Sequence, residues 1–497
     1  MHAIPQGLPM AEKLLDIHFE NPYASGHVKR PRGPRPAVMT VGQPAAAGSP
    51  GRKRPTAIPT SLQLSLQAQA VTFYLNYYME PLPADALGVT KSLDDYICQL
   101  SAGSSSELLD AAIRCMALET YSRVHGYHER ASAEAVQHHQ ELLSLARRSV
   151  ARLGAQNLDE GLLGVFFLSR FDASTHAPAE LRRKLSESRV HHYNGAMAML
   201  KYWVDHLRGG SDKDHIRPSV SPIIKESRRG LLRFLLMHTL EVPEWMKDGE
   251  VFGEVGLEEI YDQVTVRTAD LRHRVSRLLR QQTAETSFSS KYEVPLAQRL
   301  CDLNQEAQDL DSMLCDWVAQ FQLSWAYQQH TLKMPNDPKR TKHAPLSSQI
   351  YTYSNMSYAM LWAKYASVRL LVNDAHLRIT SFCNNILVST DPKVESHCRL
   401  VVEQMTDIIV CSKAFFMGEL YVGRTSMGGE TVIYSEKSEF CQAKCKYATW
   451  PLSVVCSLES VDMPRRLWCK EELHRVGRLA GIKLFEEYQP SHGFRLD

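Results

Sequence analysis

Apolar residues recur at helical spacing along most of the chain. The clearest example is a series of apolar side chains that follow one another at alternating steps of three and four residues. These are Leu300, Leu303, Ala307, Leu310, Leu314, Trp317 and Phe321. The series predicts a helix of roughly 30 residues with one continuous apolar face.

This apolar face has two interpretations. One is the seam of a coiled-coil dimer, and the other is burial within the same domain. Trp317 and Phe321 are bulky for a two-stranded seam, and the flanking positions lack the paired charges that select a coiled-coil partner. We therefore favour burial within the domain.

The same periodicity marks other helices and their ends. Ser104 and Glu107 have the spacing of an N-terminal capping box, and Gly154 stands where a C-terminal cap is expected. The apolar stripe before Gly154 consists of Val136, Leu143, Val150 and Leu153. A further long helix is marked by Tyr358, Leu361, Tyr365, Val368, Leu371 and Val372.

Alternating patterns typical of strands are rare, and only GETVIYS at 429–435 suggests a short one. We therefore expect an all-α fold, a multi-helical array of packed helical hairpins, in one unit over residues 61–497. Residues 1–60 hold ten of the 24 prolines and six glycines. Because such a segment buries little apolar surface, we expect a disordered arm there.

Charge is distributed unevenly between these two parts. The whole chain carries a net charge of +2, but residues 1–60 hold eight Lys or Arg against three Asp or Glu. The basic residues of this arm form two clusters: Lys29, Arg30, Arg32 and Arg35, then Arg52, Lys53 and Arg54. They are candidates for nuclear import or for contact with a DNA backbone. A plain basic linker and reading of the DNA minor groove remain alternatives.

Sequence motifs for common enzyme classes are not found. The chain has no phosphate-binding loop, no dinucleotide-binding glycine pattern, no nucleophile elbow and no H-E-x-x-H motif. The eleven cysteines are widely spaced, which favours a reducing compartment. The pair Cys441 and Cys445 lacks a second pair of zinc ligands, and adjacent histidines such as His138 and His139 point in different directions on a helix. We expect no metal, no cofactor and no enzyme activity.

Several segments, in order, resemble the regulatory domain of fungal zinc binuclear cluster transcription factors. They are QAVTFYLNYYM (69–79), LLDAAIRCMALETYSR (108–123), HHYNGAMAMLKYW (191–203), IYTYSNMSYAMLWAKYASVRLLV (350–372) and the stretch from WPLSVV to LFEEY (450–488). The last segment is most similar, with its Trp-Pro-Leu helix, a loop, Arg-x-Trp and a Gly-Ile turn. The resemblance covers about residues 65–490.

The chain departs from this family at its DNA-binding module. The family holds two zinc ions with six cysteines, whereas no cysteine precedes Cys98 here. Because the thiolates are the zinc ligands, this module cannot fold in the chain as given. The sequence leaves open whether this is a natural co-regulator or a gene model that lacks an upstream exon. We expect any DNA contact to be non-specific and made by the basic arm.

The resemblance implies a transcriptional regulator or co-regulator located in the nucleus. Such a regulator would act through self-association, through another transcription regulator or through a small-molecule effector. The resemblance also implies that its target genes belong to a metabolic or secondary-metabolite cluster. No segment is apolar for the ~20 residues that span a membrane, so we expect no membrane partner. Two alternatives remain: a helical enzyme with a hydrophobic pocket, and an interaction scaffold outside the nucleus.

Overall fold

The computed structural model describes most of the chain from residue 64 to residue 480. The gaps are 79–86, 92, 94–95, 98–105, 127, 152–153, 155–157, 175–178, 210–219, 285–292, 333–345, 386–391, 425–429 and 435–441. The arm that we expect over residues 1–60 lies outside the described residues.

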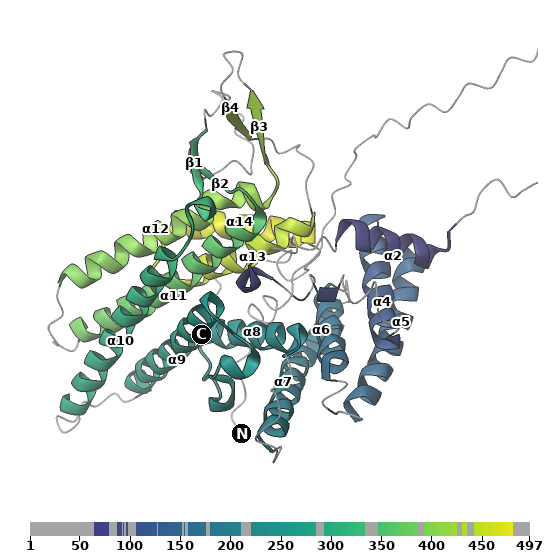
Figure 1. Cartoon of the computed structure of the whole chain (residues 1–497), viewed down its shortest axis with the longest axis horizontal. Coiled ribbons are helices and arrows are strands. Elements are labelled where there is room, and N and C mark those ends of the chain that lie inside the picture. Colours follow the sequence, from purple (N-terminus) through teal and green to yellow (C-terminus); the bar gives the residue numbers. More distant parts are fainter. Residues whose placement is uncertain are drawn as a thin grey trace, which may run out of the picture.

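The described residues form twelve α-helices (Figure 1). In the first half they are α2 (Leu66–Tyr77), α4 (Glu107–Val124), α5 (Glu129–Ala151), α6 (Leu158–Ser174), α7 (Ala179–Gly209) and α8 (Pro222–Met237), with the short 3₁₀ helix η1 (Gly88–Thr90) after α2. In the second half they are α9 (Leu257–Ala284), α10 (Glu293–Ala319), α11 (Met356–Asn385), α12 (Pro392–Phe416), α13 (Gln442–Ser457) and α14 (Met463–Ala480).

Helices that follow one another in the chain pack against one another. The pairs α4 with α5, α6 with α7, α8 with α9, α10 with α11, α11 with α12 and α13 with α14 are all in contact. In Figure 1 the chain passes from α2, α4 and α5 at one side through α6, α7 and α8 to α9–α14 at the other. The fold is an all-α, multi-helical array, as the sequence predicts.

Two small hairpins interrupt the helices. The strands β1 (Gln328–Thr331) and β2 (Gln349–Thr352) pair antiparallel, as do β3 (Leu420–Arg424) and β4 (Glu430–Tyr434). The short strand suggested by GETVIYS is therefore confirmed as β4. The other three were not predicted, because strands of four or five residues give too short an alternation to recognise.

The predicted apolar face at 300–321 is buried inside the chain. It belongs to α10, where Leu310, Leu314 and Trp317 are fully buried. The helix packs between α9 and α11, and the indole nitrogen of Trp317 donates a hydrogen bond of 2.9 Å to the carbonyl oxygen of Leu257. Burial within the domain is thus confirmed, and the face is not available as a dimer seam.

The stripe predicted for α5 does not coincide with its buried face, although Leu143 packs against the core; Leu153 lies outside the described residues. Val136 and Val150 are 43% and 45% exposed. The buried face instead consists of Ala131, Ala135, Leu142 and Ala146, and it packs against α4 and α6. Small alanine side chains permit close packing of helices. The sequence prediction relied on the larger apolar residues and therefore missed the face made largely of alanine.

The start of α4 also differs from the expected capping box. The helix begins at Glu107, and Ser106 is its N-cap, with a hydroxyl that accepts from the backbone N–H of Leu109 at 3.4 Å. Ser104 lies outside the described residues. Ser106 serves as the cap because its hydroxyl stands next to the first free N–H groups of the helix.

Candidate functional site

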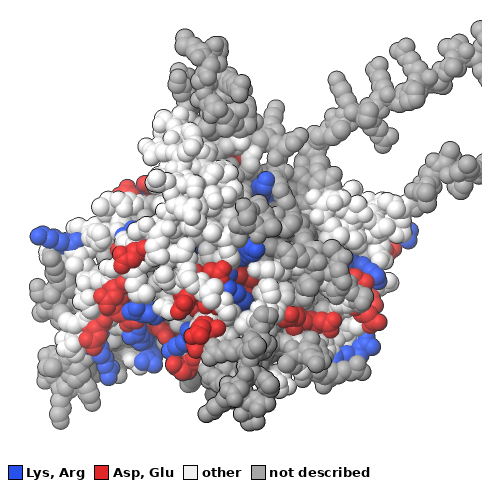
Figure 2. All heavy atoms as spheres, viewed as in Figure 1, with Lys and Arg blue, Asp and Glu red and all other residues white. Residues whose placement is uncertain are grey.

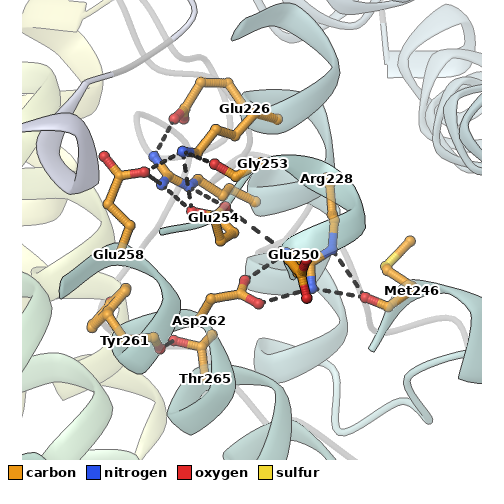
Figure 3. Close-up of polar contacts among 12 residues, drawn as sticks. Glu226, Arg228, Met246, Glu250, Gly253, Glu254, Glu258, Tyr261, Asp262 and Thr265 are labelled. Carbon is orange, nitrogen blue, oxygen red and sulfur yellow. Dashed lines mark hydrogen bonds and ion pairs between the residues drawn. The ribbon is translucent and has the colours of Figure 1, made fainter. Parts of the chain in front are cut away.

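A dense group of charged side chains lies where α8, the connection that follows it and the start of α9 meet. The connection contains the 3₁₀ helices η2 (Glu244–Met246) and η3 (Glu250–Phe252). We call the group the α8–α9 ion cluster; it consists of Lys225, Glu226, Arg228, Arg229, Glu254, Glu258 and Asp262 (Figure 3). In Figure 3 the side chains from α8 face those from the connection and from the first turns of α9.

Arg228 has no exposed side-chain surface, and neither has Glu254. The two terminal nitrogens of Arg228 donate to the two carboxylate oxygens of Asp262 at 2.5 and 2.9 Å. Nε and Nη2 also donate to the carbonyl oxygen of Met246 at 2.9 and 2.8 Å. The planar guanidinium matches the geometry of the Asp262 carboxylate. Because the same side chain also contacts Met246, it holds η2 against both α8 and α9.

Arg229 connects the same cluster to the distant helix η1. It donates to Glu254 at 2.8 Å, to Glu258 at 3.0 Å and to the carbonyl oxygen of Gly88 at 2.9 Å. A Cβ at Gly88 would lie 1.5 Å from a carboxylate oxygen of Glu258, so a larger residue there would displace this carboxylate. The cluster therefore joins α8 and α9 to the segment that follows α2.

Lys364 of α11 lies on the other side of η1. Its ammonium group donates to the carbonyl oxygen of Val89, and the hydroxyls of Thr90 and Ser357 lie 2.6 Å apart. Burial lowers the pKa of Lys364 to about 7, and the neighbouring Arg233 acts in the same direction. Because each cation of the α8–α9 ion cluster has a carboxylate partner, the cluster is a structural joint rather than a binding site.

A surface pocket of about 310 Å³ opens beside this joint. It is lined by Glu241, Lys247, Arg267, Asp270, His273, Arg274, Arg277 and Glu306. Five of these residues stand on successive turns of α9, and the others come from the α8–α9 connection and from α10. Figure 2 shows charged side chains of both signs across the lower part of this face, including the region of α9 and α10.

Two of the acidic residues in the pocket are already engaged. Asp270 accepts from Lys247 at 2.8 Å and from the backbone N–H of Val242 at 3.3 Å. Glu306 accepts from Arg274. The hydrogen bond from Lys247 to Asp270 raises the pKa of Lys247, which stays protonated. These two pairs form the walls of the pocket.

Two arginines in the pocket have no carboxylate partner in the described part of the chain. Nη1 of Arg267 lies 3.1 Å from the sulfur of Met313, which is a weak acceptor. Arg277 is exposed, and no ion pair or hydrogen bond is found for it among the described residues. The third acid, Glu241, is exposed as well, so the unengaged groups carry a net positive charge.

His273 is held in a defined orientation at the same place. Its Nδ1 lies 2.8 Å from the carbonyl oxygen of Thr239, to which it donates. Thr239 has a φ of +52°, the only positive φ of a non-glycine residue in the described ranges. With Nδ1 occupied, Nε2 is the ring nitrogen left for a ligand. The pocket thus combines two guanidinium groups that have no carboxylate partner among the described residues with an oriented imidazole.

A second constellation resembles a nucleophilic triad. Cys398 lies 3.2 Å from Nδ1 of His376, whose Nε2 lies 2.7 Å from the amide oxygen of Asn304. Burial raises the pKa of the Cys398 thiol to about 12 and lowers the pKa of His376 to about 4. A nucleophilic cysteine needs the opposite pair of shifts. The three groups therefore form a neutral hydrogen-bonded chain inside the core.

One histidine from each of the adjacent pairs His138/His139 and His191/His192 lies near the same carboxylate. His192 of α7 and His139 of α5 lie 3.1 and 3.8 Å from the two oxygens of Asp172 on α6. No group of three or more metal-ligating side chains that could hold an ion is found in the described part of the chain. Cys445 is buried, and Cys441 lies outside the described residues.

The candidate residues of the basic arm also lie outside the described residues. These are Lys29, Arg30, Arg32, Arg35, Arg52, Lys53 and Arg54. Sequence reasoning missed the pocket on α9. The available signal was the arginine-rich stretch RTADLRHRVSR, with Arg267 and Arg274 seven residues apart on one face. None of the described helices combines the length and the apolar character needed to cross a membrane.

Comparisons with protein-family models, with curated proteins and with solved structures find no match to the chain. Its likeness to the fungal regulatory domain therefore rests on the quoted segments alone.

Proposed function

We propose that the chain is a transcriptional regulator or co-regulator that acts in the nucleus through its helical body. The observation that carries the proposal is where the family-like segments lie in the fold. They form α2, α4, the end of α7, α11 and the α13–α14 hairpin. Each of these helices contributes buried side chains to one hydrophobic core, among them Tyr74, Met116, Leu200, Leu371 and Leu452.

The body and the arm have separate roles in this proposal. The arm, with its seven basic residues in two clusters, supplies nuclear import and at most a non-specific attraction to DNA phosphates. The helical body supplies surfaces for another regulator or for a second copy. Its charged pocket gives a small-molecule effector a place to bind beside the joint between η1, α8, α9 and α11.

Nuclear import is the first test. The full chain carries a fluorescent tag, and Lys29, Arg30, Arg32, Arg35, Arg52, Lys53 and Arg54 are all changed to alanine. We expect the tagged chain to accumulate in the nucleus and the variant to lose that accumulation. Unchanged nuclear localisation of the variant would defeat the import role of the arm.

The same experiment addresses the alternative of a scaffold outside the nucleus. For that alternative, the tagged chain stays in the cytoplasm whether or not the basic residues are present. A matched control changes the exposed pair Arg147 and Arg148 of α5 to alanine. This control removes surface charge from the folded body and should leave localisation as it is.

A further inference from the structure

We propose that the pocket on α9 binds a small organic anion that carries at least two carboxylate or phosphate groups. The inference deepens the proposed function by giving the effector a chemical class and a site. It rests on the proposed function only for its biological role, because binding is a property of the purified chain.

The charge balance of the pocket favours an anion. Four of its eight lining residues are Lys or Arg and three are Asp or Glu. Once the pairs of Lys247 with Asp270 and of Arg274 with Glu306 are set aside, the remaining charged lining residues are Arg267, Arg277 and Glu241, with a net charge of +1. A guanidinium fork matches a carboxylate or a phosphate in a two-pronged contact. The pocket therefore offers more oxyanion-binding groups than the chain itself uses.

The spacing of the two arginines favours a ligand with two anionic groups. Arg267 and Arg277 are ten residues apart on α9, so their Cα atoms are about 15 Å apart along the helix axis. One oxyanion cannot satisfy both guanidinium groups at that separation unless both long side chains bend towards it. A ligand with an oxyanion at each end can contact both, and His273 stands between the two arginines in the sequence of the same helix.

The size of the pocket favours a small molecule over an acidic peptide. Its volume of about 310 Å³ is at the lower end of the range for small-ligand pockets. The walls are preformed, because Lys247, Arg274 and His273 are each fixed by a partner within the chain. A ligand would order few side chains on binding, which favours affinity.

The pocket is connected to the α8–α9 ion cluster through the segment that carries Lys247. Lys247 follows Met246 directly, and the carbonyl of Met246 accepts from Arg228. The same connection carries Glu254, which pairs with Arg229, and Arg229 donates to Gly88 of η1. Because Lys247 lines the pocket, a ligand bound there lies against the segment that carries part of the α8–α9 ion cluster.

Binding is tested by calorimetry on the full chain with citrate, inorganic phosphate and glucose at matched ionic strength. We expect citrate to bind at least tenfold more tightly than phosphate, and glucose not to bind. The variant Arg267→Gln/Arg277→Gln should weaken citrate binding at least tenfold. The matched control Arg147→Gln/Arg148→Gln, which removes the same charge from exposed positions of α5, should bind like the parent chain.

Two further variants keep the test decisive if the double variant does not fold. Arg277→Gln alone changes an exposed side chain and should weaken citrate several-fold, whereas Glu241→Gln removes the unengaged acid and should tighten it. Absence of citrate binding, equal binding of phosphate, or an equal loss in the α5 control overturns the proposal. Ligand binding by the purified chain and nuclear import of the tagged chain are measured independently. A chain that does not bind citrate but enters the nucleus would contradict only the ligand proposal.

Discussion

The sulfur of Cys398 lies 3.2 Å from Nδ1 of His376, inside the core between α11 and α12. Since Nε2 of His376 donates to Asn304, Nδ1 is the acceptor and the thiol is the donor. Both groups are neutral in this arrangement. The thiolate and imidazolium pair that cysteine hydrolases need is disfavoured by burial on both sides.

We predict that Cys398 is inert in the folded chain. Its alkylation by iodoacetamide at pH 8 should be on the order of a hundredfold slower than that of the exposed Cys301, and full reactivity should return in denaturant. Mass spectrometry of the labelled peptides measures both rates in one sample. Comparable rates for Cys398 and Cys301 in the native chain would restore the enzyme alternative.

The ion pair of Arg228 with Asp262 should be costly to break from one side. Arg228→Met leaves the buried carboxylates of Asp262 and Glu254 without that cation, so we expect a loss of about 3–5 kcal/mol in the free energy of unfolding. The double variant Arg228→Met/Asp262→Leu should recover much of this loss.

Urea denaturation measures these changes. Arg130→Met, which breaks an exposed pair with Glu134 at 2.9 Å, is the control and should cost at most about 1 kcal/mol. Equal losses for Arg228→Met and Arg130→Met would show that the α8–α9 ion cluster does not hold the helices together.

Lys364 should make stability depend on pH. Its pKa is about 7 in the folded chain and near its ordinary value when unfolded, so between these values the unfolded chain binds the extra proton. The free energy of unfolding should therefore rise as the pH increases from 7 to 9, by on the order of 2 kcal/mol.

The variant Lys364→Met removes this titration. We expect a flatter profile from pH 7 to pH 9 than in the parent chain, whereas Lys201→Met, at an exposed position of α7, should keep the parent slope. Identical slopes for the parent chain and Lys364→Met would show that Lys364 keeps the ordinary lysine pKa in the folded chain.

The buried face of α5 is a direct check on the fold. Leu142→Ala empties a fully buried position and should cost about 2–5 kcal/mol. Val136→Ala changes a side chain that is 43% exposed and should stay within about 0.5 kcal/mol of the parent chain. Chemical denaturation of the two variants compares the faces, and the reverse order of costs would support the stripe expected from the sequence.

The contrast between α10 and α5 shows what the sequence could predict. On α10 the large residues Leu310, Leu314 and Trp317 mark the buried face, so size and spacing agree. On α5 the buried face is made largely of alanine, and apolar spacing alone cannot tell which of two weak stripes meets a neighbour. Helix existence was therefore easier to predict than helix orientation.

The site depends on contacts between distant parts of the chain. Lys364 donates to Val89, which is 275 residues away, and Arg228 meets Asp262 across 34 residues and two 3₁₀ helices. No local pattern encodes such pairs. Arginines spaced at seven residues on α9 were visible in the sequence, but the pairing of Arg274 with Glu306, which leaves Arg267 and Arg277 unengaged, emerges only in the fold.

Chromatin association of the tagged full chain tests the regulator role most directly. Immunoprecipitation from crosslinked cells should recover the chain at discrete loci, whereas the purified chain alone should hold DNA weakly and lose it as salt rises. A chain that is recovered at no locus above background, although it is folded and expressed, would contradict a role in transcription.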